Sequence, residues 1–114
     1  MKDTLYVLRP GFDDGGARYF CPYCAQVTGY LTYFPEVRDT LEIIELDFAR
    51  PRRALVDLIG EANQSMPKLV LADGAQAIDA PGVEISLANG RRFVTNTAAI
   101  LRYLALTRGT PLPH

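Results

Sequence analysis

The chain has 114 residues, of which 48% are apolar and 22% charged, and its formal net charge at neutral pH is −1. This length is typical of one globular domain, here 1–114, which can fold without a disulfide framework. The near-zero net charge lacks the basic excess that nucleic acids and anionic membranes attract, so we expect neither as a partner.

The location of the protein can be argued from its apolar runs and its first residues. No apolar run approaches the ~18 residues that a membrane-spanning helix needs. The N-terminal stretch MKDTLYVLRPGFDD becomes acidic too early for a secretory signal peptide. We therefore expect a cytoplasmic protein with reduced thiols. A cysteine pair in that compartment is more often catalytic or metal-binding than structural.

Two strands and one helix are predicted in the first half. The β-rich run TLYVL at 4–8 predicts a buried strand, and the glycine-containing segment 11–20 predicts a loop. A helix is expected from Pro22, which suits a first helical turn, to Pro35, which ends or kinks it. The run LEIIELD at 41–47 predicts the second strand.

The second half begins with a helix and a strand. Apolar residues recur at helical spacing after Pro51 and predict a helix that ends before the segment SMP at 65–67. The run KLVLA at 68–72 predicts the third strand. A loop-rich excursion is expected over 73–90, with a candidate small strand at 83–87.

A fourth strand and a last helix complete the predicted elements. The strand is RRFVT at 91–95. Asn96 and Thr97 are both good N-caps for the helix, and Gly109 is a good stop. The predicted order β-α-β-α-β-β-α describes an α/β fold with a four-stranded mixed sheet and helices on both faces. The first two strands should be parallel, and the last two should form an antiparallel hairpin with the excursion in its turn.

Both cysteines of the chain, Cys21 and Cys24, lie in the stretch YFCPYCAQ. Cys21 would stand at the start of the first helix, where unpaired N–H groups and the helix dipole stabilise an anion. A thiol at a helix start in a Cys-X-X-Cys arrangement has its pKa lowered from ~8.5 toward or below neutrality. We expect Cys21 to be exposed and to attack, and Cys24 to be buried and to resolve.

Two other interpretations of the cysteines stay open. The only histidine is His114, so neither a Cys-His dyad nor a four-ligand zinc site within one chain is expected. A metal or cluster shared between two subunits would take two thiolates from each chain. Alternatively, the cysteines are small apolar residues packed at a helix start, without chemistry.

The Met66-Pro67 pair is a second candidate feature. A cis bond before Pro67 would turn the backbone N–H and C=O of Met66 outward, where an extended peptide-like ligand could pair with them as an added strand. Arg18 is a third candidate. It lies three residues before Cys21, where it could favour the thiolate, grip a carboxylate or simply be solvated.

These motifs together resemble a known superfamily. Cys21-Pro22-Tyr23-Cys24 resembles the active-site motif of dithiol glutaredoxins, while MPKLVLADG and VTNTAAILRYLA resemble segments of the N-terminal domain of glutathione S-transferases. Both families are thioredoxin-like, and the resemblance covers most of the chain outside 73–90. The chain is also similar to a small bacterial family of uncharacterised thioredoxin-like proteins, a domain of unknown function.

The resemblance implies a glutaredoxin-like thiol–disulfide oxidoreductase in which Cys21 is the nucleophile and Cys24 the resolving thiol. It implies no permanently bound cofactor, with glutathione as co-substrate and Pro67 as the cis-proline. The implied glutathione-binding residues are Tyr23, Met66, Pro67, Asn96 and Thr97, and the candidate Arg18 is added to them. Asn96 and Thr97 fall where the transferases hold the γ-glutamyl group, although both also suit a plain helix cap.

Whether the protein is an enzyme stays open at this point. One hypothesis is a glutathione-linked thiol–disulfide oxidoreductase acting on glutathione or on a protein thiol or disulfide. The other is a binding module or redox sensor for a protein partner, in which Tyr19, Phe20 and Tyr23 make the contacts. Longer loops than those of glutaredoxins, at 9–20 and 73–90, favour the second hypothesis.

Overall fold

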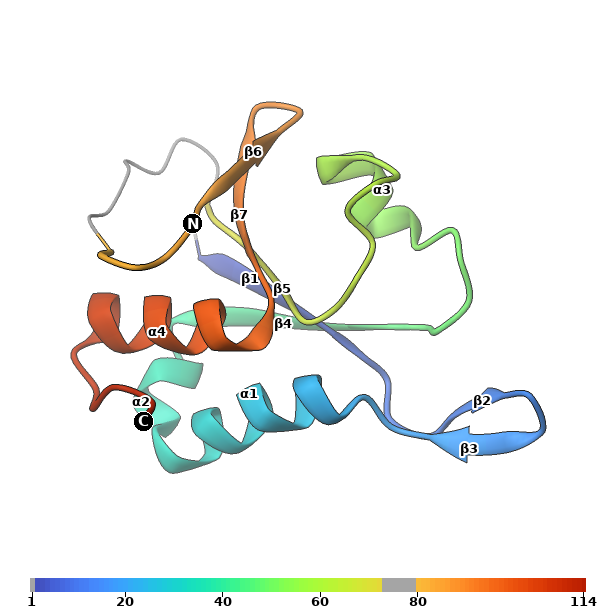
Figure 1. Ribbon diagram of the computed structural model, residues 1–114, viewed down its shortest axis with the longest axis horizontal. Helices are drawn as coiled ribbons and strands as arrows, with labels where there is room; N and C mark the ends of the chain where they lie inside the picture. The colour runs from blue at the N-terminus through green and yellow to red at the C-terminus, as the bar shows by residue number, and fades with distance from the viewer. Residues whose placement is uncertain (1, 73–79) are drawn as a thin grey trace.

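A computed structural model describes residues 2–72 and 80–114; part of the predicted excursion, 73–79, lies outside the described residues. The fold is an α/β arrangement in which helices cover both faces of a five-stranded mixed sheet (Figure 1). The strands of this sheet are β1 (Asp3–Leu8), β4 (Leu41–Leu46), β5 (Lys68–Val70), β6 (Ser86–Ala88) and β7 (Arg91–Thr95), in the spatial order β4-β1-β5-β7-β6.

The sheet contains both strand pairs that the sequence predicts, a parallel β1–β4 pair and an antiparallel β5–β7 pair. β1 and β4 are parallel, with Leu5 opposite Ile43. β5 runs antiparallel to β1 and to β7, and this second pairing places Lys68 directly opposite Thr95. The start of β5 and the end of β7 therefore meet at one edge of the fold, although the excursion separates them in sequence.

Within residues 2–72 and 80–114, four helices pack on this sheet: α1 (Pro22–Tyr33), α2 (Pro35–Arg38), α3 (Arg53–Ile59) and α4 (Thr97–Arg108). α1 and α4 lie side by side on one face with α2 at their end, while α3 covers the opposite face (Figure 1). None of the helices in the described ranges is long and apolar enough to span a bilayer.

Strand alternation divides the buried apolar side chains between two cores. In β1, Leu5 and Val7 face the α1–α4 side, whereas Tyr6 faces α3. The first core also contains Cys24, Val27, Leu31, Val37, Leu69, Val94, Ile100 and Leu104; the second contains Leu55, Ile59, Val70 and Phe93.

Local signals place the ends of α1 and α4. Pro22 occupies the first turn of α1, and Pro35, which cannot continue that helix, begins α2. In α4, the Asn96 side chain accepts a hydrogen bond from the Ala99 N–H at 2.9 Å, and Gly109 ends the helix in the left-handed conformation. The predictions for both helices are confirmed.

α3, the helix predicted to begin at Pro51, is shorter than the sequence pattern indicates. α3 begins at Arg53 rather than at Pro51, and it ends at Gly60, whose φ of 92° a residue with a side chain rarely adopts. The apolar spacing continues beyond Gly60, which is why the sequence pattern overextended the helix. The segment between this glycine and β5 instead carries the chain back to the sheet.

The prediction of an irregular loop at 11–20 is wrong. This segment contains a two-stranded hairpin of β2 (Phe12–Asp14) and β3 (Ala17–Tyr19), which projects from the body of the protein (Figure 1). Gly15 and Gly16 both have positive φ and supply its turn. The Phe12 ring stacks on that of Phe48 at 4.4 Å, which anchors the hairpin base. Strands this short show no alternation that a sequence pattern can detect.

The predicted four-stranded sheet is also wrong, since β6 adds a fifth strand. The candidate strand at 83–87 is displaced to Ser86–Ala88, where it pairs with β7 in a tight hairpin. Asn89 and Gly90 form the turn with φ of 51° and 74°. Asn-Gly favours such turns, and the position of the turn determines the register of β6.

Candidate functional site

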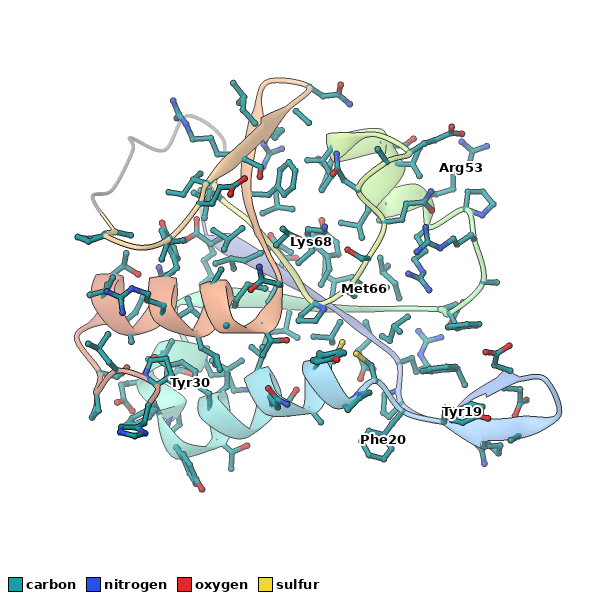
Figure 2. The ribbon with its side chains drawn as sticks, viewed as in Figure 1. Tyr19, Phe20, Tyr30, Arg53, Met66 and Lys68 are labelled. Carbon is teal, nitrogen blue, oxygen red and sulfur yellow. The ribbon has the colours of Figure 1, made fainter. Side chains whose placement is uncertain are left out.

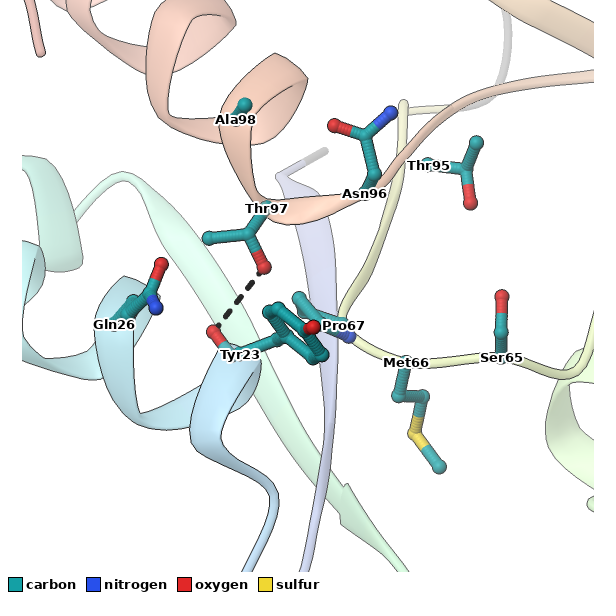
Figure 3. Close-up of a pocket in the computed structure, with 9 residues that line it drawn as sticks. All are labelled: Tyr23, Gln26, Ser65, Met66, Pro67, Thr95, Asn96, Thr97 and Ala98. Atoms are coloured by element: carbon teal, nitrogen blue, oxygen red, sulfur yellow. Dashed lines mark hydrogen bonds between the residues drawn. The ribbon is translucent and has the colours of Figure 1, made fainter.

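A cavity of about 430 Å³ opens where three segments distant in sequence meet (Figure 3). It lies between the first turns of α1, the segment before β5, and the β7–α4 junction. Its lining residues are Tyr23, Gln26, Ser65, Met66, Pro67, Thr95, Asn96, Thr97 and Ala98. Five of these nine, namely Tyr23, Met66, Pro67, Asn96 and Thr97, were predicted as binding residues from the sequence.

The wall between the two helices is held by a hydrogen bond. Thr97 Oγ1 donates to the backbone carbonyl of Tyr23 at 3.3 Å, which joins the start of α4 to the start of α1 (Figure 3). Thr97 is buried, whereas Tyr23 is 61% exposed and forms the open side of the cavity. The Met66–Pro67 peptide bond is cis, and Pro67 is buried beside the Tyr23 ring (Figure 3).

Cys21 is the N-cap of α1 and lies next to Met66, one of the residues that line this cavity. Its Sγ accepts a hydrogen bond from the backbone N–H of Cys24 at 3.1 Å and is 4.0 Å from the carbonyl oxygen of Met66. A sulfur so placed receives a helix N–H and the positive end of the helix dipole, both of which stabilise negative charge.

The expectation of an exposed Cys21 is wrong. Cys21 is only 9% exposed, because it packs into the first core beneath the Met66 segment. Cys21 and Cys24 also border a second cavity of about 430 Å³ together with Phe20 and Pro10. The Phe20 side chain, which is 62% exposed, lines this second cavity.

Cys24 is the more buried thiol of the pair. It is 4% exposed, and both cysteines are free thiols in the structure. Burial, followed by the hydrogen bond to Cys21, raises the pKa of Cys24 to about 12. Cys24 therefore stays protonated at neutral pH and can donate its proton toward Cys21.

Arg52 is a residue near the thiols that sequence reasoning missed. Its side chain is buried, with Nε and Nη2 donating to the Phe48 carbonyl at 3.2 and 2.7 Å and Nη1 donating to the Gln64 carbonyl at 2.8 Å. The Arg52 charge interacts with Cys24 and lowers the pKa of that thiol, against the larger effect of burial. No sequence signal distinguishes Arg52 from its neighbours Arg50 and Arg53, because its burial depends on the tertiary structure.

Arg18 is not brought to the site. It lies on β3, exposed, where Nη2 donates to the Gly11 carbonyl at 3.0 Å and Nε is 3.7 Å from an Asp13 carboxylate oxygen. The hairpin that was predicted as a loop explains the difference. Because the chain reverses at residues 15–16, Arg18 is held on the projecting strand rather than near the thiols.

Four lining residues, Gln26, Ser65, Thr95 and Ala98, were not predicted as site residues. Gln26 follows Tyr23 by one helical turn, so helical spacing was the available signal. Ser65 and Thr95 come together through Lys68, which donates to both hydroxyls. Only the register of β5 against β7 places Thr95 there.

No group of three or more His, Cys, Asp or Glu side chains gathers in a metal-binding arrangement within residues 2–72 and 80–114. Cys21 and Cys24 are the only cysteines in the chain, so a metal shared between subunits through four thiolates would take this pair from each of two chains.

Comparison with known proteins identifies the family of the chain. Residues 2–112 match the family described as a protein of unknown function, DUF3088, and the chain belongs to that family. No curated protein and no solved structure shows significant similarity to the chain.

Proposed function

We propose that this member of the DUF3088 family is a thiol–disulfide oxidoreductase with a thioredoxin-like fold, in which Cys21 attacks and Cys24 resolves. The observation that carries the proposal is the position of Cys21 Sγ at the N-cap of α1, accepting the Cys24 N–H at 3.1 Å. The parallel β1–β4 pair, the antiparallel β5 and β7, and the cis Met66–Pro67 bond beside the thiols support the fold assignment.

The proposed reaction transfers two electrons from the two thiols to a disulfide. The Cys21 thiolate attacks one sulfur of the substrate, forms a mixed disulfide and releases the other sulfur as a thiolate. Cys24 then gives up its proton, attacks Cys21 Sγ and releases the second substrate thiolate. Two molecules of glutathione reduce the resulting Cys21–Cys24 disulfide and become oxidised glutathione.

The properties of Cys24 suit the resolving role. With a pKa of about 12, Cys24 is a poor nucleophile until a base takes its proton. In the mixed disulfide, Cys21 Sγ is bonded to the substrate sulfur, so the proton of Cys24 passes to the departing substrate thiolate as Cys24 Sγ bonds to Cys21 Sγ. The proposed reaction needs reduced thiols, which the cytoplasm maintains, so we propose a cytoplasmic location.

The cavity gives the proposed glutathione a place to lie. Its cysteinyl backbone would pair with Met66, whose carbonyl is 4.0 Å from Cys21 Sγ, and its γ-glutamyl end would meet the start of α4. The hydroxyl of Thr97 already donates its proton to the Tyr23 carbonyl. The side-chain donor to the γ-glutamyl end of glutathione would therefore be Asn96 Nδ2. Tyr23 and Pro67 would form the sides of the groove, while Arg18 takes no part.

The test is a comparison of three proteins incubated with a glutathionylated peptide and glutathione. The wild type should regenerate the free peptide, Cys21→Ser should not, and Cys24→Ser should accumulate glutathione on Cys21, as read by intact mass. The proposal fails if Cys21→Ser retains turnover, or if Cys24→Ser acquires no glutathione while it remains folded by circular dichroism.

A second candidate function is favoured by the exposed aromatic side chains around the thiols. Tyr19, Phe20 and Tyr23 are 50%, 62% and 61% exposed, and Tyr19 lies on the projecting hairpin (Figure 2). Such residues are enriched where proteins bind partners, so the fold would then serve as a binding module or redox sensor. A partner captured equally by the wild type and by the Cys21→Ser/Cys24→Ser double variant would favour this thiol-independent role.

A further inference from the structure

Lys68 carries a buried positive charge that no described acidic residue neutralises. Its side chain is 2% exposed, and none of the ion pairs in the described part of the chain includes it. Nζ donates to Thr95 Oγ1 at 2.8 Å and to Ser65 Oγ at 3.2 Å, and it lies 5.4 Å from the centroid of the Phe93 ring. Burial lowers the pKa of Lys68, as expected of an ammonium without a compensating anion.

The two hydroxyls that hold this ammonium keep their own protons to donate. An ammonium has three donors and no acceptor, so Ser65 and Thr95 must accept from it through their oxygen atoms. Each hydroxyl proton then needs another acceptor. Both residues line the cavity, and their oxygen atoms turn toward one another at the end away from Gln26 (Figure 3).

This end of the cavity therefore offers hydrogen-bond donors together with a positive charge. Both hydroxyl residues line the cavity, and the buried Lys68 ammonium donates to each of them. Hydrogen bonds in such a chain polarise one another, and hydrogen bonds to a charged group are about twice as strong as neutral ones. A negatively charged acceptor gains from both effects, whereas a cation would face the Lys68 charge.

We propose that the Ser65–Thr95 end of the cavity is a subsite for an oxyanion group, a carboxylate or a phosphate, which accepts from both hydroxyls and balances the charge of Lys68. The subsite is built by the sheet, since Lys68 and Thr95 are paired across β5 and β7. Thr95 immediately precedes Asn96, the N-cap of α4, and Ser65 immediately precedes Met66, whose carbonyl is 4.0 Å from Cys21 Sγ. The inference requires no thiol chemistry.

The composition of the chain makes the test selective. Lys2 and Lys68 are its only lysines, and Lys2 is exposed far from the cavity lining. In the full-length protein labelled with ¹³C,¹⁵N-lysine, the side-chain ε-methylene signals therefore report one buried and one exposed ammonium. The probes are sodium acetate and sodium phosphate, titrated against sodium chloride at constant ionic strength.

The Lys68 signal should shift saturably with at least one probe, whereas the Lys2 signal should show only the response to salt. The tighter probe identifies the group as carboxylate or phosphate. Ser65→Ala and Thr95→Val, which keep the lysine, should each weaken binding about tenfold, the loss expected of one charge-assisted hydrogen bond. Thr95→Ser, which keeps the hydroxyl, should bind as the wild type does.

Two results would overturn the subsite: no saturable shift of Lys68 with either probe, or unchanged affinity in both Ser65→Ala and Thr95→Val. The titration is repeated in the Cys21→Ser/Cys24→Ser double variant. Oxyanion binding that persists there supports the subsite even if the thiol chemistry proposed above fails. Turnover by the wild type with no response of Lys68 to either probe would reject the subsite alone.

Discussion

The hydroxyl of Thr97 donates a hydrogen bond to the backbone carbonyl of Tyr23 at 3.3 Å, and this bond joins the N-termini of α1 and α4. Both helix starts border the same cavity, so the two positive dipole ends converge on it, and Cys21 is the N-cap of one of these helices, α1. The hydroxyl proton of Thr97 is used within the protein. A ligand at this wall therefore meets Asn96 and the cavity lining rather than the Thr97 side chain.

Two substitutions of Asn96 should distinguish how much its side-chain cap and its backbone conformation each contribute to the free energy of unfolding. Asn96 has φ of 65° and ψ of 151°, a region that suits glycine, and its side chain caps α4. Asn96→Ala loses the cap and adds backbone strain, so the free energy of unfolding should fall by about 2 kcal/mol or more. Asn96→Gly loses only the cap and should fall by about 1 kcal/mol or less. Urea denaturation measures both, and equal losses would contradict this account.

Arg52 should contribute to both stability and thiol reactivity. Arg52→Met leaves the carbonyls of Phe48 and Gln64 without their donor, which should cost about 3 kcal/mol of unfolding free energy. The loss of the nearby charge should also slow alkylation of the reduced protein by iodoacetamide at pH 7. Arg52→Lys keeps the charge and should retain more of the alkylation rate.

The matched control for Arg52 is its exposed neighbour Arg53. Arg53→Met removes the same charge from the sequence without reaching the thiols, so both the alkylation rate and the stability should stay near wild type. If Arg52→Met alkylated as fast as Arg53→Met, the electrostatic role of Arg52 would be wrong and only its hydrogen bonds would matter.

Alkaline pH should destabilise the reduced protein through Cys24. The pKa of Cys24 is raised from its ordinary value of 9.0 to about 12 in the folded state. Below pH 9 both states are protonated and the contribution to stability is complete. Between pH 9 and 12 the unfolded state releases this proton first, so stability falls by up to ~1.4 kcal/mol per pH unit.

The Cys24→Ala variant should lack this part of the pH dependence, as measured by urea denaturation at successive pH values with reductant present. Its unfolding free energy should approach that of the wild type as pH rises. Val27→Ala, at a buried position without a titrating group, should run parallel to the wild type instead. Parallel curves for Cys24→Ala would disprove the assignment.

The charge of Lys68 should give a pH dependence of the opposite sign. Burial lowers the pKa of Lys68 below its ordinary 10.5 in the folded state, so at intermediate pH the unfolded chain binds more protons. Stability should therefore rise with pH toward 10.5, by at most ~1.4 kcal/mol per pH unit. Lys68→Met should lack this rise, whereas the exposed Lys2→Met should show it. Identical pH profiles for both variants would exclude the effect.

Much of the fold could be predicted because its signals are local. Pro22, Asn96 and Gly109 mark helix ends through their own backbone preferences, and the β-rich runs of β1, β4, β5 and β7 identify strands of the sheet. Patterns missed β2 and β3 and misplaced β6, because these strands have three residues each and, unlike the equally short β5, do not lie in a continuous apolar run. The excess length predicted for α3 has the same origin, since apolar spacing does not show where Gly60 turns the chain.

The sequence by itself determined that two thiols three positions apart stand at a helix start, and that helix caps and prolines lie around them. Only the tertiary structure decided that Cys21 is nearly buried, that Arg52 lies near the pair, and that Lys68 faces the hydroxyls of Ser65 and Thr95. The physical reason is the range of the contacts. A helix cap or a Cys-X-X-Cys spacing is determined within one helical turn. The burial and charge environment of a side chain instead depend on contacts between distant segments, such as the pairing of β5 with β7 and the packing of α3 on the opposite face of the sheet.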